Sequence, residues 1–205
     1  MTDSYQFGID VSEHQDGLSL VQAAAEGIEF VIVRTTDGTY QDRTYASHVE
    51  DAHRAGLPVE AYHYLRNPSE GTTVAEQVDA ACAVMGEYVY PVWLDCETPA
   101  GLSITHVRQA RELFLARGVP VTGIYTYPRY WRWRMLGAST VEFGVVWVAD
   151  YGPDDPGYPR KLFAARGGKW PGDIGKQTPL MWQYGSRGRV AGYEVDVNAR
   201  RASDW

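Results

Sequence analysis

The stretch PVWLDCE, residues 91–97, has the composition of a buried strand and ends in two carboxylates. Side chains alternate between the two faces of a strand, so Asp95 and Glu97 project on one side while Cys96 projects on the other with the aliphatic residues. In parallel barrels, catalytic residues lie at the carboxyl ends of the strands. This stretch therefore predicts a strand of such a sheet, with both acids at its functional edge.

One unit recurs along the first two thirds of the chain: a helix-like segment, a glycine and a short apolar strand, repeating about every thirty residues as in βαβ units. Two of the helix starts, Ser19–Gln22 and Thr73–Glu76, have the spacing of a capping box. The glycines that follow the helix-like segments suit the left-handed residue that ends a helix: Gly27, Gly56, Gly86 and Gly118.

Eight segments have the composition of strands, and eight is the number of parallel strands that closes a TIM-like barrel. Helix-like segments follow the first five, whereas the later linkers are short or rich in glycine and proline. We therefore expect a single α/β domain, a TIM-like barrel that is irregular late in the chain. An open doubly wound sheet is the alternative, but no GxGxxG phosphate loop follows the first strand. The predicted strands are 7–12, 29–35, 57–65, 87–95, 119–127, 144–150, 179–185 and 193–198.

The composition limits the class of function. The 205 residues are 44% hydrophobic and carry a formal net charge of -7, which permits a buried core and disfavours a nucleic-acid-binding surface. No apolar run approaches about 18 residues, and the start of the chain lacks a signal-like apolar core, so we predict neither membrane insertion nor a Sec signal. Cys82 and Cys96 lack CxxC spacing and are expected to be buried free thiols.

Two further predicted parallel strands end with an acid on their inward-facing side, Asp10 on the first and Asp196 on the last. If the barrel closes, these strands are neighbours, and both acids meet Asp95 and Glu97 at one mouth. Crowded, partly buried carboxylates raise one another's pKa values and destabilise the folded protein. That energetic cost suggests that the arrangement serves a function. A glycosidase needs one protonated carboxyl and one ionised carboxylate. We predict Glu97, the longer side chain at the rim, as general acid and Asp95 as its partner.

Each of these acids taken alone is equally well explained as a helix cap or a turn residue, and only their convergence favours catalysis. No histidine joins them at ligand spacing, so neither a metal nor another cofactor is predicted. Sugar rings pack on aromatic faces, and aromatic residues gather at the same strand ends, although about half of such rings belong to the core. The substrate-binding candidates are Tyr62, Tyr125, Trp182, Gln183 and Asn198.

Seven motifs, taken in order and spacing, resemble glycoside hydrolase family 25, the Chalaropsis-type lysozymes of bacteria, fungi and bacteriophages. The resemblance implies an irregular (β/α)5β3 barrel that cleaves the β-1,4 bond between N-acetylmuramic acid and N-acetylglucosamine. It implies Glu97 as general acid, Asp95 as partner carboxylate, Asp10 and Asp196 as support, and Tyr62 and Trp182 as substrate contacts. The motifs are GIDVSEHQ (8–15), FVIVRTTDG (30–38), AGLPVEAYHYL (55–65), PVWLDCE (91–97), IYTYPRYW (124–131), WVADY (147–151) and MWQYGSRGRVAGYEVDVN (181–198).

The expected partner is the glycan strand of bacterial peptidoglycan, bound by a monomer whose residues 1–205 form one catalytic domain with no separate wall-binding module. Without a Sec signal, we expect a bacteriophage endolysin that is made in the host cytoplasm and released through a holin or by another route. A chitinase-like glycosidase is the first alternative, but its longer DxxDxDxE series is interrupted here by Pro91 and Trp93. A carbohydrate-binding barrel without catalysis is the second, and such proteins typically lose the acid.

Overall fold

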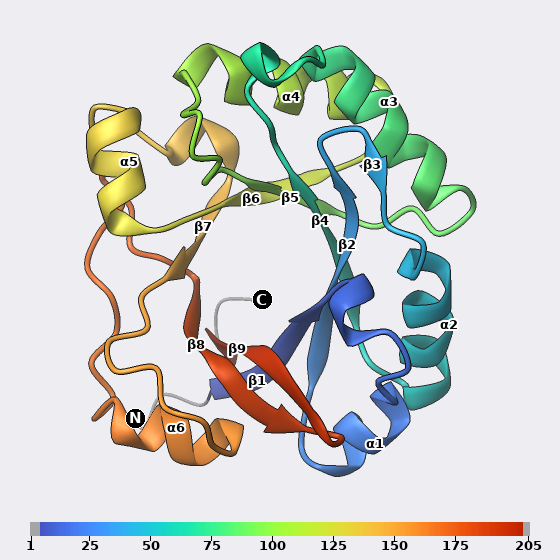
Figure 1. Cartoon of the computed structure of the whole chain (residues 1–205). Helices are drawn as coiled ribbons and strands as arrows, with labels where there is room; N and C mark the ends of the chain where they lie inside the picture. The colour runs from blue at the N-terminus through green and yellow to red at the C-terminus, as the bar shows by residue number, and fades with distance from the viewer. Residues whose placement is uncertain (1–4, 203–205) are drawn as a thin grey trace.

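A computed structural model describes residues 5–202 as a closed barrel of strands ringed by helices (Figure 1). Eight strands are hydrogen-bonded in the order β1-β9-β8-β7-β6-β5-β4-β2, and β1 pairs with β2 to close the ring. The predicted barrel is thus confirmed. Its strands are β1 (Tyr5–Val11), β2 (Phe30–Asp37), β4 (Val59–Tyr64), β5 (Val92–Asp95), β6 (Val121–Thr126), β7 (Val145–Ala149), β8 (Met181–Val190) and β9 (Tyr193–Arg201), and a short β3 (Tyr40–Gln41) pairs with the end of β2.

Helices follow β1, β2, β4, β5 and β6, as predicted, and the β8–β9 hairpin closes the side of the barrel between α6 and α1 (Figure 1). The late linker holds one helix more than the sequence predicts, α6. None of the helices within residues 5–202 has both the length and the apolar composition needed to cross a membrane. The helices are α1 (Leu20–Ala25), α2 (Tyr45–Ala55), α3 (Val74–Met85), α4 (Ile104–Ala116), α5 (Pro128–Arg134) and α6 (Pro159–Ala165), with single turns η1 (Glu13–Gln15), η2 (Pro68–Glu70) and η3 (Val141–Phe143).

The predicted helix boundaries hold with one difference in detail. Thr73 and Glu76 form a reciprocal capping box at the start of α3, whereas Ser19 accepts from the backbone N–H of Gln22 and the Gln22 side chain instead donates to Glu26. The four glycines expected to end helices all have positive φ: Gly27, Gly56, Gly86 and Gly118.

The last strand departs from a fully parallel barrel. β9 runs antiparallel to both β8 and β1, because only Ala191 and Gly192 separate it from β8, and a parallel crossover needs a far longer connection. Both turn residues have positive φ, which suits a two-residue hairpin. The expectation that Asp196 sits at the carboxyl end of a parallel strand is therefore wrong. Asp196 lies near the beginning of β9, and its antiparallel direction brings it opposite Asp10.

The fourth predicted strand is shorter than expected, because β5 begins only at Val92. The preceding residues turn after α3, where the Tyr88 N–H donates to the Met85 carbonyl, and Pro91 has no N–H for a strand ladder. Past the end of β5 the alternation continues: the Cys96 N–H donates to the Tyr125 carbonyl, and the Cys96 side chain is fully buried. The buried thiol is confirmed for Cys96, whereas Cys82 is half-buried.

The strands separate two apolar layers. Their outward residues, Val92 and Leu94 among them, pack under the helices, and their inward residues form a smaller cluster that includes Trp93 and Trp147. At the end of the barrel away from the acids, Arg200 and Glu60 form a buried ion pair at 3.2 Å, and the Trp93 indole N–H donates to Glu60 at 2.7 Å. These buried side chains fill that end of the barrel.

Candidate active site

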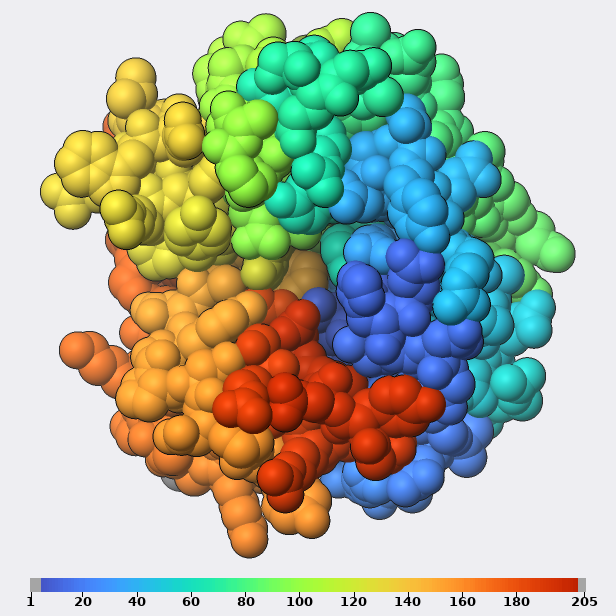
Figure 2. Space-filling view, viewed as in Figure 1, coloured from blue at the N-terminus to red at the C-terminus, as the bar shows by residue number. Residues whose placement is uncertain are grey.

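The barrel mouth holds an acidic pocket of about 250 Å³. The four predicted carboxylates all line it: Asp10 from β1, Asp95 from β5, Glu97 just beyond β5 and Asp196 from β9. In the space-filling view this face is hollowed near its centre, where segments from the beginning, middle and end of the chain meet (Figure 2). The structure thus brings the four acids into one cavity.

Two amides hold the carboxylate of Asp10. The side-chain NH2 groups of Gln183 and Asn198 each donate to Asp10 Oδ2 at 2.8 Å. The Asn198 oxygen accepts from the Trp147 indole N–H at 2.8 Å, which turns the NH2 group of Asn198 toward Asp10. Both predicted amides therefore lie at the site, and their donors stabilise the ionised form of Asp10.

Tyrosines fix the orientation of Gln183. Its side-chain oxygen accepts from the hydroxyls of Tyr125 at 2.8 Å and Tyr151 at 2.6 Å, which leaves only its NH2 group for Asp10. Tyr125 and Tyr62 both line the acidic pocket, as predicted. Tyr125 packs against the Trp147 ring at 4.5 Å between centroids, so this wall of the pocket is built from interlocked aromatic rings.

Asp196 and Asp10 lie opposite each other on β9 and β1, and a hydrogen bond joins their carboxyl groups. Burial raises the pKa of Asp196 to about 9, and the charge of Asp10 together with a hydrogen bond to it acts in the same direction. Burial also raises the pKa of Asp10, but the hydrogen bonds from Asn198, Gln183 and Asp196 oppose that shift. At neutral pH, Asp196 is therefore the protonated member and donates to the Asp10 carboxylate.

The second pair, Asp95 and Glu97, has no such donors within residues 5–202. Burial, and after it the charge of Asp10, raises the pKa of Glu97 to about 7. Burial and the charge of Glu97 hold the pKa of Asp95 well above its usual range. Asp95 is 5% exposed, and among the described residues its Oδ1 has no hydrogen-bond partner. The ionised form of Asp95 therefore lacks a stabilising partner in the described protein. A ligand would supply that partner as a hydrogen-bond donor or as a positive charge.

Two arginines that the sequence reasoning missed also line the pocket, Arg34 and Arg66. Arg34 pairs with Asp42 at 2.8 Å, and Arg66 makes a bidentate pair with Asp37 at 2.6 and 2.8 Å. Both cations are thus bound to acids outside the four. Strand alternation could have found Arg34, which follows the inward residues of β2, but Arg66 lies beyond the end of β4, where periodicity says nothing.

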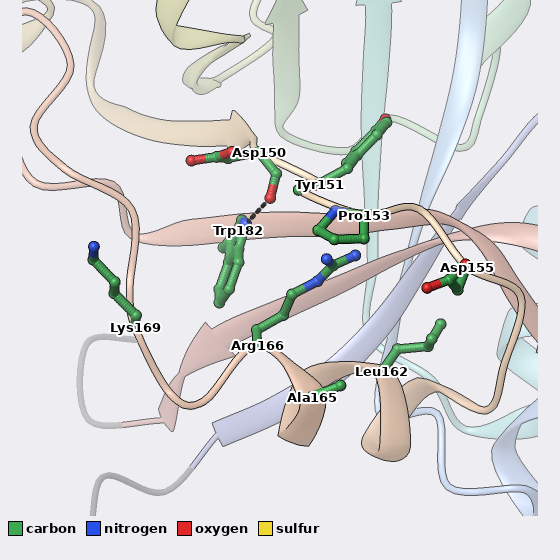
Figure 3. Close-up of a pocket in the computed structure, with 10 residues that line it drawn as sticks. Asp150, Tyr151, Pro153, Asp155, Leu162, Ala165, Arg166, Lys169 and Trp182 are labelled. Carbon is green, nitrogen blue, oxygen red and sulfur yellow. Dashed lines mark hydrogen bonds between the residues drawn. The ribbon is translucent and has the colours of Figure 1, made fainter.

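Two predicted substrate-binding residues do not line the acidic pocket: Asn198, which is fully buried and reaches only Asp10 there, and Trp182. Trp182 precedes Gln183 on β8 and therefore points to the opposite face, where its ring packs against Phe163 and Trp170. Its indole N–H donates to the Asp150 carbonyl at 2.8 Å, and it lines a separate cavity (Figure 3). Within residues 5–202, no group of three or more His, Cys, Asp or Glu side chains is placed to hold a metal ion.

Residues 9–193 match the family described as "Glycosyl hydrolases family 25". The chain belongs to this family. It is 30% identical over 163 residues to the autolytic lysozyme of Clostridium acetobutylicum and 30% identical over 216 residues to lysozyme M1 of Streptomyces globisporus. These matches cover 73% and 95% of the chain but only 46% and 66% of the two relatives, so the chain spans about half to two thirds of their length.

Solved structures of a lysozyme and of an endolysin share the fold. A lysozyme from Streptomyces coelicolor is 27% identical, with a TM-score of 0.73 over 95% of this chain and 91% of that one. The catalytic domain of endolysin ply40 from bacteriophage P40 of Listeria monocytogenes is 22% identical, with a TM-score of 0.69 over 99% and 96%, a likeness of fold alone. The family resemblance and the irregular barrel expected from the sequence are therefore confirmed.

Proposed function

We propose that this family 25 protein is a muramidase that hydrolyses the β-1,4 bond between N-acetylmuramic acid and N-acetylglucosamine in bacterial peptidoglycan. The convergence of four carboxyl groups with raised pKa values in one pocket is the observation that carries the proposal. The names of two relatives, an autolytic lysozyme and lysozyme M1, support the choice of reaction over that of a chitinase-like glycosidase.

Glu97 is proposed as general acid and base. A pKa of about 7 leaves a substantial protonated fraction near neutral pH, as proton donation to a glycosidic oxygen requires. As the C–O bond breaks, the proton moves from Glu97 to the departing sugar hydroxyl. Glu97 then accepts a proton from the water that completes hydrolysis.

Asp95 is proposed as the partner carboxylate. Positive charge develops at the anomeric carbon as the bond breaks, and a buried carboxylate without donors interacts strongly with such charge. Asp95 and Glu97 project from the same side of one strand, a closeness that favours retention over the inverting separation of roughly 6.5–9.5 Å. Asp95 acts either as nucleophile or by orienting the substrate's 2-acetamido group, and both routes retain configuration.

Asp10 and Asp196 are proposed to support this pair. Their shared proton keeps one negative charge beside Glu97, and that charge contributes to the raised pKa of the acid. Gln183 and Asn198 then act by orienting Asp10, since their donors are already directed to it. Tyr62 and Tyr125 present the aromatic surface of the pocket to the sugar.

The test replaces Glu97 with glutamine, which keeps the shape of the side chain and removes the acid. We expect clearing of purified cell walls to be lost, while circular dichroism remains that of the unmodified protein. Glu112→Gln makes the same chemical change at an exposed position on α4 and serves as the control. Reducing-end analysis of the released muropeptides identifies the bond. Retained lysis by the Glu97 variant, or preferential cleavage of chitin oligomers, would contradict the proposal.

We further propose that the protein acts as an endolysin, as a monomer. The catalytic domain of endolysin ply40 has the same fold, which is compatible with this role. Expression inside a bacterial host, with and without a hole-forming membrane protein, tests it: lysis is expected only with the holin. Light scattering checks the monomeric state, and lysis without a holin would point to another export route.

A further inference from the structure

The proposed general acid lies beyond the end of a strand. β5 ends at Asp95, and Glu97 follows two residues later. On its amino-terminal side, Cys96 is fixed to β6, because the Cys96 N–H donates to the Tyr125 carbonyl and the Cys96 carbonyl accepts from the Thr126 hydroxyl, both at 2.9 Å. The position of the Glu97 carboxyl therefore depends on what holds the residue that follows it.

Thr98 holds that other side, and it does so through Glu70. The Thr98 side chain is fully buried, and its hydroxyl donates to Glu70 Oε2 at 2.7 Å. A buried hydroxyl needs such a partner, since leaving it unpaired costs roughly 1–3 kcal/mol. Glu70 belongs to η2, in the loop after β4, and it does not line the acidic pocket. Its carboxylate thus contacts the segment that carries the acid without reaching the cavity.

The sequence NPSE, residues 67–70, fixes the position of Glu70 locally. Asn67 and Glu70 form a capping box: the Asn67 side chain accepts from the Ser69 N–H at 2.8 Å, and the Asn67 backbone N–H donates to Glu70 Oε2 at 2.9 Å. The side-chain amide of Asn67 also donates to the Gly101 carbonyl, in the loop after β5. One short turn therefore contacts that loop at two points.

Arg66 links the same carboxylate to a third strand. Its Nη1 donates to Glu70 Oε1 at 2.9 Å, while its Nε and Nη2 donate to Asp37 at the end of β2. Burial acts to raise the pKa of Glu70, but hydrogen bonds from Thr98 and Arg66 outweigh it and hold that pKa below its usual range. Glu70 is therefore a fixed anion at neutral pH. The ends of β5, β4 and β2, which are neighbours in the barrel (Figure 1), are joined by one chain of polar contacts.

We infer that Glu70 and Thr98 are positioning residues for the general acid: their hydrogen bond holds the backbone beyond Glu97 and so keeps the Glu97 carboxyl in place beside Asp95. This inference rests on the proposed muramidase activity and extends it to two residues outside the pocket lining. A general acid must lie within hydrogen-bonding reach of the glycosidic oxygen, and a displacement of about 1 Å can lower a rate about a hundredfold.

The test breaks this bond with little change of shape. Thr98→Val replaces the hydroxyl with a methyl group, whereas Thr98→Ser keeps the donor. On soluble glycan strands, we expect kcat to fall roughly ten- to a hundredfold in Thr98→Val while KM stays within about twofold, and we expect Thr98→Ser to keep most of the activity. Glu70→Ala removes the acceptor instead and should act in the same way, so it tests the inference even if the buried valine variant does not fold.

Thr73→Val is the matched control. The Thr73 hydroxyl donates to Glu76 Oε2 at 2.8 Å at the start of α3, so this change breaks the same kind of bond outside the pocket lining. It should lower the free energy of unfolding and leave kcat unchanged. An equal loss of kcat in Thr73→Val would identify general destabilisation as the cause and would overturn the inference.

NMR titration of the labelled Glu97 carboxyl gives a readout that does not require catalysis, and Glu97→Gln assigns its signal. Burial raises the pKa of Glu97 from 4.5 to about 7, so a carboxyl released from its position should titrate nearer to 4.5 in Thr98→Val and Glu70→Ala. The alkaline limb of the pH–rate profile should move to lower pH with it, because the acid must be protonated to act. The charged groups that line the pocket around Glu97 remain in every variant: Asp10, Asp37, Asp95, Asp196, Arg34 and Arg66.

The outcomes separate the two proposals. If the unmodified protein releases no muropeptides, the proposed muramidase activity is wrong, and the titration still reports whether Thr98 and Glu70 hold Glu97. If the protein is active but both variants keep its kcat, or change KM alone, the activity stands and the positioning inference is overturned. An unchanged titration of Glu97 in both variants also overturns it, whatever happens to kcat.

Discussion

Replacing Glu97 with glutamine should stabilise the protein at alkaline pH while it abolishes activity. Folding raises the pKa of Glu97 from 4.5 to about 7, chiefly because burial disfavours the charged form. The unfolded chain therefore releases this proton at lower pH than the folded protein does, and stability is lost as the pH rises through that interval. The shift corresponds to about 3 kcal/mol, which solvent reaching this partly exposed side chain reduces to about 2 kcal/mol. Glutamine carries no charge and removes the penalty.

Urea unfolding followed by tryptophan fluorescence measures the difference at about pH 4 and about pH 8. At the higher pH the Glu97 variant should unfold at more urea than the unmodified protein, and at the lower pH the two should coincide. Glu112→Gln, on the exposed side of α4, should follow the unmodified protein at both pH values. Equal stabilities at pH 8, or a gain of the same size at pH 4, would refute the reasoning, because the burial of a charge would then not be its cause.

Three further predictions concern one residue of the site and two features of the barrel that carries it. Gln183→Met removes a donor to the Asp10 carboxylate and raises its pKa further, so kcat/KM should fall roughly tenfold and the acid limb of the pH–rate profile should move to higher pH. Arg200→Met leaves Glu60 buried without its cation and should destabilise the protein by about 3–5 kcal/mol in urea, with partial recovery when Glu60→Gln is added. Gly123→Ala places a Cβ 1.9 Å from a backbone carbonyl oxygen of β7, which should lower the unfolding free energy by at least about 3 kcal/mol, measured in the same way.

Strand alternation explains why much of the site could be predicted. A period of two assigns a face to every strand residue without knowledge of the partner strands, so the inward positions of Asp10 and Asp95 follow from their apolar neighbours alone. Asp196 reached the correct face although its strand runs in the opposite direction. Reversing a strand preserves the alternation, and the two-residue turn before β9 returns the chain to the same mouth.

Alternation also corrects one prediction. Consecutive residues of a strand point to opposite faces, so alternation alone shows that Trp182 and Gln183 cannot both line the acidic pocket.

Interactions that depend on distant packing could not be predicted in this way. The pairing of Arg66 with Asp37 and the two hydroxyls that orient Gln183 come instead from segments joined only in the folded barrel. No local pattern predicts such contacts, because they depend on strand register and loop conformation.

The arrangement of donors explains how the four acids can act differently in the proposed reaction. The amide donors and the proton of Asp196 satisfy Asp10, so that pair is stable before any substrate binds. Within residues 5–202 Asp95 has no such help, and Arg34, a cation that lines the same pocket, is already bound to Asp42. The electrostatic repulsion among the crowded acids is therefore left uncompensated at Asp95 and Glu97. Positive charge that develops at the anomeric carbon reduces this repulsion as the bond breaks. Stabilisation that grows toward the transition state, rather than on binding, is what accelerates a reaction.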